Sequence, residues 1–403
     1  MEGNTVNNDW WAFEQRPGAI RNGHRVGSAC DWWRNAEADF DRMAELAQNA
    51  HRLSVEWSRL EPEEGRVDDG AVRRYRQMLQ GLRDRGIAPL LTLHHFTLPL
   101  WVARSGGWEN PRIVAWMGRY ARWCAGWFGD LVEDWIPINE PNLVVVLGYL
   151  LGRHPPGIRN PLRARRVVPH LLRAHAAAYR AIHAEHPAAR VGTAHHLRLL
   201  EPARPHSLLD RAVAAAHSQF VNWMWLDVLA WGEGRSALWS GRVEECAGTM
   251  DFVGINYYTA DRIRAALGSP GTGCGRVVRP PGVALSDGGY GELRPDGLRW
   301  ALAETWRRYG LPLCVTENGL PDEDDDQRPG FLLDHVEAVR RAQRAGIPVW
   351  GYYHWSLVDN FEWAEGWTLK FGLIAVDPVT QRRTERPSAR LYREICRGSV
   401  LPR

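Results

Sequence analysis

Lysine is almost absent from this 403-residue sequence: Lys370 is its only lysine, and arginine supplies the other basic residues. A strong net charge is also missing, because 50 basic residues stand against 47 acidic ones and the formal charge is +3. The two kinds of charge are interspersed along the chain, whereas a protein that binds nucleic acid or a membrane surface concentrates basic residues on one face. The sequence therefore predicts neither nucleic acid nor a membrane as a partner.

Paired cysteines and long apolar runs are lacking as well. The six cysteines show no CxxC spacing and are scattered over Cys30, Cys124, Cys246, Cys274, Cys314 and Cys396. Scattered cysteines are typical of reduced thiols in cytoplasmic proteins. No apolar run reaches the length of a membrane span, and the polar N-terminal stretch has no apolar leader segment. We therefore expect a cytoplasmic protein.

Recognisable metal-binding spacings are a third absence. Two histidine pairs occur, His94–His95 and His195–His196, but neighbouring residues of a strand point to opposite faces and so cannot form a bidentate site. No HExxH-like motif is found. The acidic run Asp322–Asp326 predicts a solvated loop. A calcium site is only a minor alternative, because the spacing of the acids is unlike that of an EF-hand. The sequence predicts no metal and no cofactor.

Short apolar segments that alternate with amphipathic segments are what the sequence does contain. Strands are expected at 51–57, 87–96, 190–197, 251–258 and 348–355, and two more end at Glu140 and Glu317. Helices are expected from Pro111 and over roughly 37–49, 69–85, 164–186, 295–309, 330–345 and 387–397. The stretches 4–36 and 264–292 are predicted as loops, the second a flexible one. This alternation indicates parallel βα units, and we expect residues 1–403 to form one α/β domain of the (β/α)₈ TIM-barrel class.

Two glutamates each follow an apolar run. Glu140 lies in Pro-Ile-Asn-Glu-Pro (137–141), and Glu317 lies in Val-Thr-Glu-Asn-Gly (315–319). Either residue alone is most simply a solvated loop residue or a charge at a helix N-terminus. Together they are more informative, because the carboxyl ends of barrel strands meet at one mouth. Two carboxylates that face each other there are what cleavage of a glycosidic bond requires.

The sequence around both glutamates resembles the two signatures of glycoside hydrolase family 1, the β-glucosidase and β-galactosidase family. Further matching segments occur in the family's order along nearly the whole chain. They are AHRLSVEWSR (50–59), LHHFTLP (93–99), DFVGINYY (251–258) and WSLVDNFEW (355–363). The resemblance implies a (β/α)₈ barrel that acts on a small-molecule β-glycoside or oligosaccharide without a cofactor.

The resemblance also implies roles for individual residues. Glu317 would be the nucleophile and Glu140 the acid/base of a retaining reaction. Arg52 and Tyr258 would stabilise ionised Glu317, whose charge would then hold Glu140 protonated. Asn139 would bind the sugar 2-OH, and Asn256 belongs to the supporting set.

A hexose subsite is implied in the same way, formed by His95, Trp355, Glu362 and Trp363. Core packing is the alternative for these residues, Trp355 above all. The Glu362 carboxylate would accept hydrogen bonds from sugar hydroxyls but repel a phosphate, so we expect a neutral sugar rather than a 6-phosphoglycoside. Phe96 stands where the family usually has tryptophan, which leaves the preference among glucosides, galactosides and fucosides open.

The N-terminal end departs from the family pattern. Relatives have a first barrel strand that ends in Gln-X-Glu-Gly, whereas this sequence opens at the X with Met1-Glu2-Gly3. We expect a barrel that lacks this strand and its sugar-binding glutamine, either because the start was assigned too late or because the protein is truncated. Seven strands would leave the segments 51–57 and 348–355 with unpaired edges.

Three functions are compatible with these residues. The first is a retaining exo-β-glycosidase that releases non-reducing terminal β-D-glucosyl, galactosyl or fucosyl units. A transglycosidase would use the same site with an alcohol or sugar as acceptor. A catalytically impaired sugar binder is the third, motivated by the missing strand. The sequence leaves the natural aglycone and the oligomeric state open.

Overall fold

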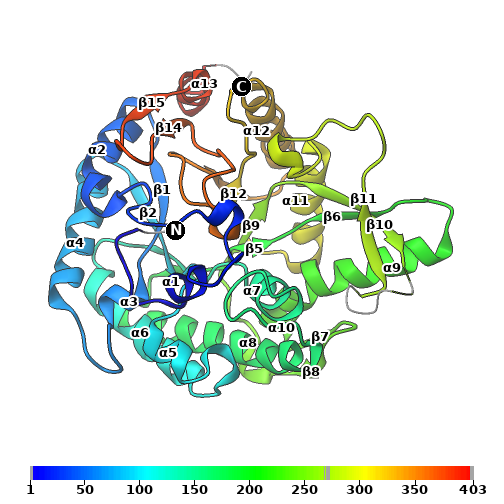
Figure 1. Ribbon diagram of the computed structural model, residues 1–403, viewed down its shortest axis with the longest axis horizontal. Helices are drawn as coiled ribbons and strands as arrows, with labels where there is room; N and C mark the ends of the chain where they lie inside the picture. The colour runs from blue at the N-terminus through cyan, green and yellow to red at the C-terminus, as the bar shows by residue number, and fades with distance from the viewer. Residues whose placement is uncertain (1–2, 267, 269–272, 400–403) are drawn as a thin grey trace.

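The computed structural model describes residues 3–266, 268 and 273–399. A barrel of parallel strands surrounded by helices forms its centre (Figure 1). The barrel strands are β1 (Ala50–Ser54), β2 (Ala88–His94), β3 (Asp134–Ile138), β4 (Arg190–Val191), β5 (His195–His196), β9 (Val253–Tyr257), β12 (Leu313–Asn318) and β13 (Val349–His354). The expected (β/α)₈-barrel class is confirmed.

The strands follow one another around the barrel in chain order. One sheet runs β1-β2-β3-β4 and a second runs β5-β9-β12-β13. The segment 190–196 joins them, because β4 pairs with β3, β5 pairs with β9, and isolated bridges connect Asn139 to Ala194 and Gly192 to Phe252. β4 and β5 are therefore two parts of one barrel strand, as the expected strand 190–197 indicates.

Strand composition explains why these segments lie at the centre. Every residue of β3 (DWIPI), β9 (VGINY) and β12 (LCVTEN) is buried. Such runs are typical of parallel strands, which are covered by side chains on one face and helices on the other. The polar ends of these strands then fall at one mouth of the barrel.

Helices form the outer layer. The principal ones are α2 (Trp32–Glu45), α4 (Asp69–Asp84), α6 (Ile113–Phe128), α8 (Pro161–Glu185), α10 (Met224–Trp231), α11 (Pro295–Tyr309), α12 (Arg328–Arg344) and α13 (Pro387–Cys396). Their starts follow local chemistry. The Asp68 side chain caps α4 and that of Asn160 caps α8, while Pro295 occupies the first turn of α11. The observed bounds lie within a few residues of those expected.

A seam separates β1 from β13. Among the described residues no backbone pairing joins these two strands, although each is paired on its other side. A groove occupies the seam, lined by residues 48, 50–52, 316, 352–357, 373 and 392. Helix α13 lies over this region, between α2 and α12 in the outer ring (Figure 1). The unpaired edges expected for the segments 51–57 and 348–355 are therefore present in the described structure; Met1 and Glu2 lie outside the described residues.

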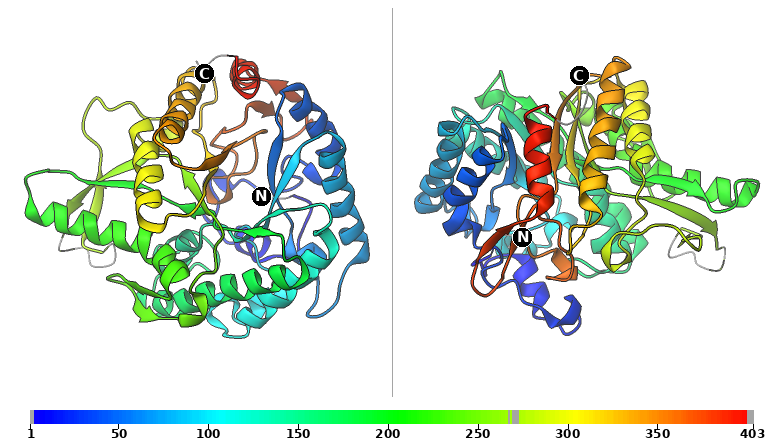
Figure 2. Two further views of the ribbon diagram at one scale, coloured as in Figure 1. Left: turned by 180° about the vertical axis from the view of Figure 1, so that it is seen from behind. Right: turned by 90° about the horizontal axis from the view of Figure 1, so that it is seen from above.

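Two segments predicted as loops contain regular structure. Residues 4–36 include α1 (Asp9–Glu14) and the start of α2, so the loop prediction was wrong there; the Asn8 side chain caps α1. The loop prediction for 264–292 was also wrong in part, because β10 (Ala260–Ala265) pairs with β11 (Gly275–Val278) and with β6 (Leu199–Pro202). This small sheet and α9 (Leu208–Ser218) project from the barrel (Figure 2). Residues 267 and 269–272 of the stretch lie outside the described part of the chain.

The acidic run 322–326 is not simply solvated, and that expectation needs correction. Asp322 and Asp325 are buried. Asp322 accepts backbone hydrogen bonds from Asp325, Gln327 and Arg328, which fixes the start of α12. Asp325 forms a fully buried ion pair with Arg328 and also accepts from both the backbone and the hydroxyl of Ser388 in α13. Two of the five acids are therefore buried and connect this loop to the starts of α12 and α13.

Candidate active site

Glu140 lies just after β3, in a position fixed by its backbone. The Asn139 N–H donates to the His94 carbonyl at 2.9 Å, and the Glu140 N–H donates to the Ala194 carbonyl at 2.8 Å. Glu140 then turns the chain into α7 (Pro141–Val145) with a φ of +44°. A left-handed backbone at a non-glycine residue is strained, and the hydrogen bonds to the two flanking strands hold it in place. The turn keeps the carboxyl at the barrel mouth, where it is 5% exposed.

Glu317 lies within β12, near its carboxyl end. Its Oε1 forms an ion pair with Arg52 of β1, and its Oε2 accepts a hydrogen bond from the Tyr258 hydroxyl. The Arg52 and Glu317 side chains are 6% and 5% exposed, so this ion pair is almost completely withdrawn from water. The two contacts occupy both oxygens of the Glu317 carboxylate and fix its plane.

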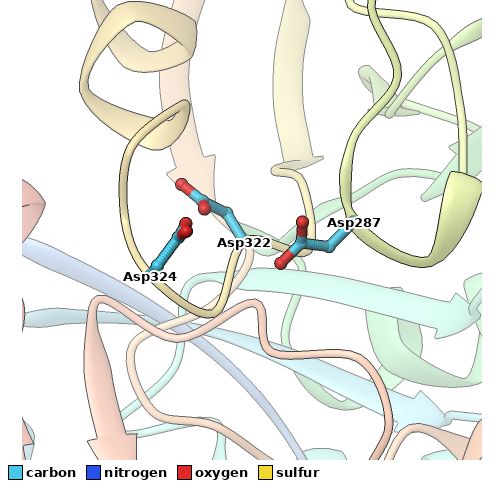
Figure 3. Close-up of side chains that lie close together, drawn as sticks. All are labelled: Asp287, Asp322 and Asp324. Carbon is cyan, nitrogen blue, oxygen red and sulfur yellow. The ribbon is translucent and has the colours of Figure 1, made fainter.

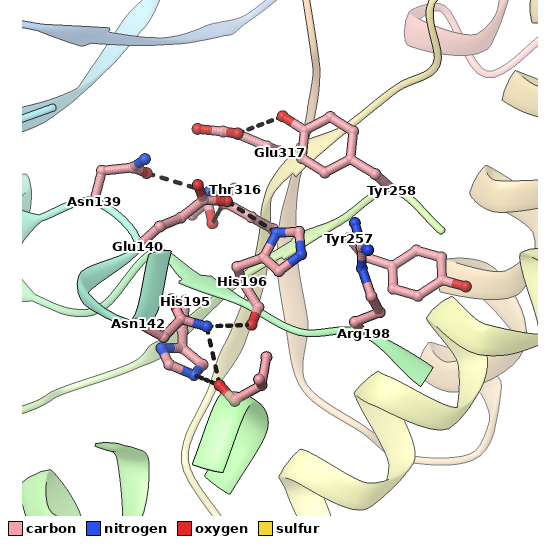
Figure 4. Close-up of polar contacts among 12 residues, drawn as sticks. Asn139, Glu140, Asn142, His195, His196, Arg198, Tyr257, Tyr258, Thr316 and Glu317 are labelled. Atoms are coloured by element: carbon pink, nitrogen blue, oxygen red, sulfur yellow. Dashed lines mark hydrogen bonds and ion pairs between the residues drawn. The ribbon is translucent and has the colours of Figure 1, made fainter. Parts of the chain in front are cut away.

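Amide side chains connect the two glutamates. Arg52 also donates to Asn139 Oδ1 at 2.6 Å. The Asn256 amide donates to Asn139 Oδ1 at 3.2 Å and to Glu140 Oε1 at 3.0 Å, and its own oxygen accepts from the Thr316 hydroxyl at 2.6 Å. Glu140 and Glu317 therefore belong to one polar network contributed by strands from around the barrel. Figure 4 shows Asn139, Glu140, Thr316 and Glu317 of this network.

His196 is a further member of this network that the sequence analysis did not assign to the site. Its Nδ1 lies 3.2 Å from Glu140 Oε1, and both side chains are 6% exposed. The histidine pair His195–His196 suggested only a metal site, so the position of His196 at a strand end was overlooked. That position was the signal that could have identified it, since the same argument selected Glu140 and Glu317.

Burial and charge act on both carboxyls. Burial is the main cause that raises the pKa of Glu317 to about 7; the Glu140 charge also raises it, while the Arg52 charge and the hydrogen bonds from Tyr258 and Arg52 lower it. Burial opposes ionisation of Glu140 too, but His196, the Asn256 amide and the Arg52 charge outweigh it, so its pKa lies below the usual value. The expected contacts of Glu317 with Arg52 and Tyr258 are present. The pKa directions are nevertheless the reverse of those expected, because burial outweighs these contacts at Glu317, while His196, Asn256 and Arg52 lower the pKa of Glu140.

Aromatic rings form a wall beside the glutamates. The His95 ring stacks near Trp355 and Trp363, with centroid distances of 5.9 and 5.8 Å and interplanar angles of 28° and 22°. The His95 Nε2 lies 3.3 Å from the Asn139 amide nitrogen. Phe96 packs edge-on against Trp363 at 5.2 Å. These rings offer apolar faces with polar edges next to the carboxyl pair.

Glu362 is the third carboxyl of the site. Burial raises its pKa to about 7; the charges of Glu317 and Glu140 add to this, and a hydrogen bond from Trp355 opposes it. Its Oε2 is buried and has no hydrogen-bond partner among the described residues. An unsatisfied buried acceptor is costly, so this oxygen is suited to a donor that arrives with a ligand.

The structure therefore brings together all ten residues singled out from the sequence. They are Arg52, His95, Asn139, Glu140, Asn256, Tyr258, Glu317, Trp355, Glu362 and Trp363, each linked to the others by the contacts and charge interactions given above.

A separate acidic group comprises Asp287, Asp322 and Asp324, whose nearest oxygens lie within 4.8 Å of one another (Figure 3). Two of its members already accept hydrogen bonds from the local backbone. Asp322 caps the start of α12, and Asp287 Oδ2 accepts from the Glu323 N–H at 2.8 Å. We assign this group a role in the loop before α12.

No helix among the described residues combines the length and apolar character needed to cross a membrane.

Comparison with known proteins agrees with this arrangement. The sequence model of glycosyl hydrolase family 1 matches residues 2–399. β-Glucosidase A of Thermotoga maritima is 32% identical over 97% of this chain and 92% of its own length. A β-galactosidase of Saccharolobus solfataricus is 32% identical over 98% of this chain and 90% of its own length.

Solved structures agree over the whole fold. A family 1 β-glucosidase from Thermotoga maritima superposes with a TM-score of 0.95 at 30% identity, covering 100% of this chain and 96% of the other. A β-glycosidase from Pyrococcus horikoshii gives 0.92 at 36% identity, covering 99% and 92%. The Thermotoga enzyme is also known in complex with glucoimidazole, with a TM-score of 0.94 at 30% identity, again covering 100% and 96%. The chain belongs to glycosyl hydrolase family 1 and is a glycosidase of the β-glucosidase type.

Proposed function

We propose that this protein is a retaining exo-β-glycosidase that releases non-reducing terminal β-D-glucosyl, galactosyl or fucosyl residues through a covalent glycosyl-enzyme. The observation that carries the proposal is the polar network in which Arg52 holds Glu317 and Asn139, while Asn256 joins Asn139 to Glu140. It holds two buried carboxyls, from different strands, in fixed orientations at the barrel mouth.

Glu317 is the nucleophile in this proposal. Its carboxylate is oriented at both oxygens by Arg52 and Tyr258, which leaves it little freedom to rotate away from a sugar carbon. Attack of one oxygen at the anomeric carbon breaks the glycosidic bond and forms an ester between the sugar and Glu317. The charge of Glu317 is consumed in this step, so its repulsion of Glu140 disappears.

Glu140 is the acid/base. The form of the pair that reacts carries the proton on Glu140 and the charge on Glu317, although burial in the substrate-free site favours the opposite distribution. In the first step Glu140 gives this proton to the departing oxygen, and in the second step the resulting carboxylate takes a proton from the attacking water. The lost Glu317 charge and the hydrogen bonds from Asn256 and His196 both favour the Glu140 carboxylate when it has to act as a base. Asn139, held by Arg52, is placed to bind the hydroxyl next to the reacting carbon.

The sugar would lie against the rings of His95, Trp355 and Trp363, with a hydroxyl donating to the unsatisfied Oε2 of Glu362. Three carboxyls in one buried site disfavour an additional anion. This supports a neutral hexose and argues against a 6-phosphoglycoside. The complexes of the Thermotoga enzyme with glucoimidazole and deoxynojirimycin support a ligand of this size.

Hydrolysis of 4-nitrophenyl β-D-glucoside, galactoside and fucoside tests the activity. We expect turnover by the wild-type chain, and a loss of about 10²–10⁴-fold in kcat/KM for Glu140→Gln with an alkyl glucoside, which needs acid assistance. Glu317→Gln should be inactive towards every substrate. Turnover by folded Glu317→Gln would contradict the assignment of the nucleophile.

The stereochemical course tests the retaining mechanism separately. NMR spectra recorded early in the reaction should show β-glucose before mutarotation produces the α anomer. An initial α product would mean that water attacks directly, and the covalent intermediate would have to be abandoned while the glycosidase assignment remained.

A further inference from the structure

His196 is placed beside Glu140 by strand geometry. His196 is paired with Asn256 across β5 and β9, and both residues reach the same oxygen of Glu140. The preceding residue points to the opposite face, where its Nε2 lies 2.9 Å from the Val221 carbonyl. One histidine of the pair thus faces the catalytic carboxyl, and the other packs against the helical layer.

The backbone of His196 is tied to the segment that carries Glu140. Asn142, two residues after Glu140, is fully buried and donates to the His196 carbonyl at 2.9 Å and to the Val221 carbonyl at 2.9 Å. The Asn142 side chain therefore connects the start of α7 to the end of β5 (Figure 4). His196 has little freedom to leave its contact with Glu140.

We propose that His196 is a positioning residue for Glu140, whose Nδ1 holds the Glu140 Oε1 atom so that Oε2 carries the proton to the leaving group. This inference rests on the proposed function. Two N–H donors, from His196 and Asn256, saturate Oε1 as an acceptor. A proton placed on Oε1 would disrupt both contacts, so it is favoured on Oε2. An imidazole that donates in this way carries a hydrogen on Nδ1.

The same contact helps Glu140 in both steps. A donor to the carboxylate favours the ionised form, which eases the departure of the proton and then supplies the base. Other charged and titratable groups also surround His196 and Glu140. Arg52 on β1, Glu317 on β12 and Glu362 supply charge, Tyr258 stacks on the His196 ring with a centroid distance of 6.2 Å, and Tyr290 and His195 lie within electrostatic range.

Two substitutions of His196 separate a hydrogen bond from mere space filling. In His196→Asn the amide nitrogen takes nearly the place of Nδ1 and keeps a donor to Glu140. In His196→Gln the amide lies near the place of Nε2, so the donor is lost while the bulk is retained. His195→Asn is the matched control, because it alters the neighbouring buried histidine on the face away from Glu140.

The first readout is the pH profile of kcat/KM. In His196→Gln the basic limb, which reports Glu140, should move to higher pH by about one unit, because the donor that favours its carboxylate is gone. His196→Asn and His195→Asn should keep the basic limb of the wild type. An unshifted limb in His196→Gln, or an equal shift in all three variants, would overturn the proposal.

The second readout is leaving-group dependence. In His196→Gln, kcat/KM for an alkyl glucoside should fall about tenfold, because a misplaced proton weakens general acid catalysis. With 2,4-dinitrophenyl glucoside, which departs without help, it should stay within about twofold of the wild type. Equal losses on both substrates would indicate only a structural role and refute the proposal. Thermal melting of each variant shows whether the fold is retained, and if His196→Gln does not fold, loss of the wild-type profile in His196→Asn would refute the proposal.

Failure of the proposed function would look different. In that case the wild-type chain would hydrolyse no glycoside, or Glu140→Gln would hydrolyse alkyl glucosides as fast as the wild type. If both of those controls behave as expected and His196→Gln remains like the wild type, only the role of His196 is wrong.

Discussion

Arg52 on β1 and Glu317 on β12 form a buried ion pair across the barrel, although 264 residues separate them in the sequence. The same guanidinium reaches Asn139, next to Glu140. One arginine therefore orients Glu317, the proposed nucleophile, and a neighbour of Glu140, the proposed acid/base.

Replacing Arg52 by methionine should damage both stability and chemistry. Removal of one partner of a buried pair leaves an uncompensated charge, which costs about 3–5 kcal/mol of unfolding free energy at a pH where Glu317 is ionised. The pKa of Glu317 should rise further, so the acidic limb of kcat/KM should move to higher pH. Urea denaturation and a pH profile measure the two effects. An unshifted acidic limb in a folded variant would show that Arg52 does not govern the charge of Glu317.

Wild-type activity should itself depend on the raised pKa of Glu317. As the proposed nucleophile, Glu317 must be ionised, and burial raises its pKa to about 7, above that of an ordinary glutamate. Protonation on acidification removes the attacking form. For a substrate whose leaving group needs no proton from Glu140, kcat/KM should therefore decline as pH drops through about 7. A profile with 2,4-dinitrophenyl β-D-glucoside checks this directly. Full activity maintained at pH 5 would mean that the substrate-free carboxyl is ionised far more easily than its burial indicates.

Glu362→Gln should weaken sugar binding and relax the rejection of phosphate. The amide keeps the shape but loses the charge that strengthens hydrogen bonds from hydroxyls, so kcat/KM for the glucoside should fall about tenfold or more. The ratio of glucoside to 6-phosphoglucoside hydrolysis should narrow, because one repelling carboxylate is gone. Parallel assays of both substrates give that ratio. An unchanged ratio would place Glu362 away from the distal part of the sugar.

The seam between β1 and β13 should be visible in hydrogen exchange. The bonds from Ala88 N–H to the Asn49 carbonyl and from Val55 N–H to the Thr92 carbonyl show that alternate residues of β1 face β2. The amides of Ala50, Arg52 and Ser54 consequently face the groove. They should exchange faster than the amides of β2 and β3, which lie between paired neighbours. Equal protection of β1 and β3 in residue-resolved exchange would show that the seam is closed in solution.

The buried Asp325–Arg328 pair should contribute to anchoring α13. Asp325 contacts Arg328 at the start of α12 and Ser388 at the start of α13. Asp325→Ala should lower the unfolding free energy by about 3–5 kcal/mol, because it leaves a buried guanidinium without its partner. Asp324→Ala, at the exposed neighbour, is the control and should change stability by less than about 0.5 kcal/mol. Similar losses in both variants would contradict a specific role for the buried pair.

The sequence by itself determined the barrel and the two catalytic candidates. Apolar runs that end in polar residues predict buried parallel strands, and the strand-end rule places Glu140 and Glu317 at one mouth. These signals are local, so they can be recognised without knowing which residues are in contact in the folded protein. The helix expected over 295–309 has these bounds in the structure, where Pro295 lies in the first turn and Gly310 is the left-handed C-cap.

Other features depended on partners distant in the chain, and only the tertiary structure decided them. The burial of Asp322 and Asp325 depends on α12 and α13, so a run of acids that looks solvated became part of the core. The β10–β11 pairing arises within a stretch whose glycines and prolines predict a loop. His196 was missed because its significance lies in a contact with Glu140, 56 residues away, which is one of the causes that lower the pKa of Glu140. Burial, which also follows from the tertiary structure, is the main cause that raises the pKa of Glu317. Residue type and spacing fix which groups can ionise, but burial and neighbouring charges decide which one holds the proton.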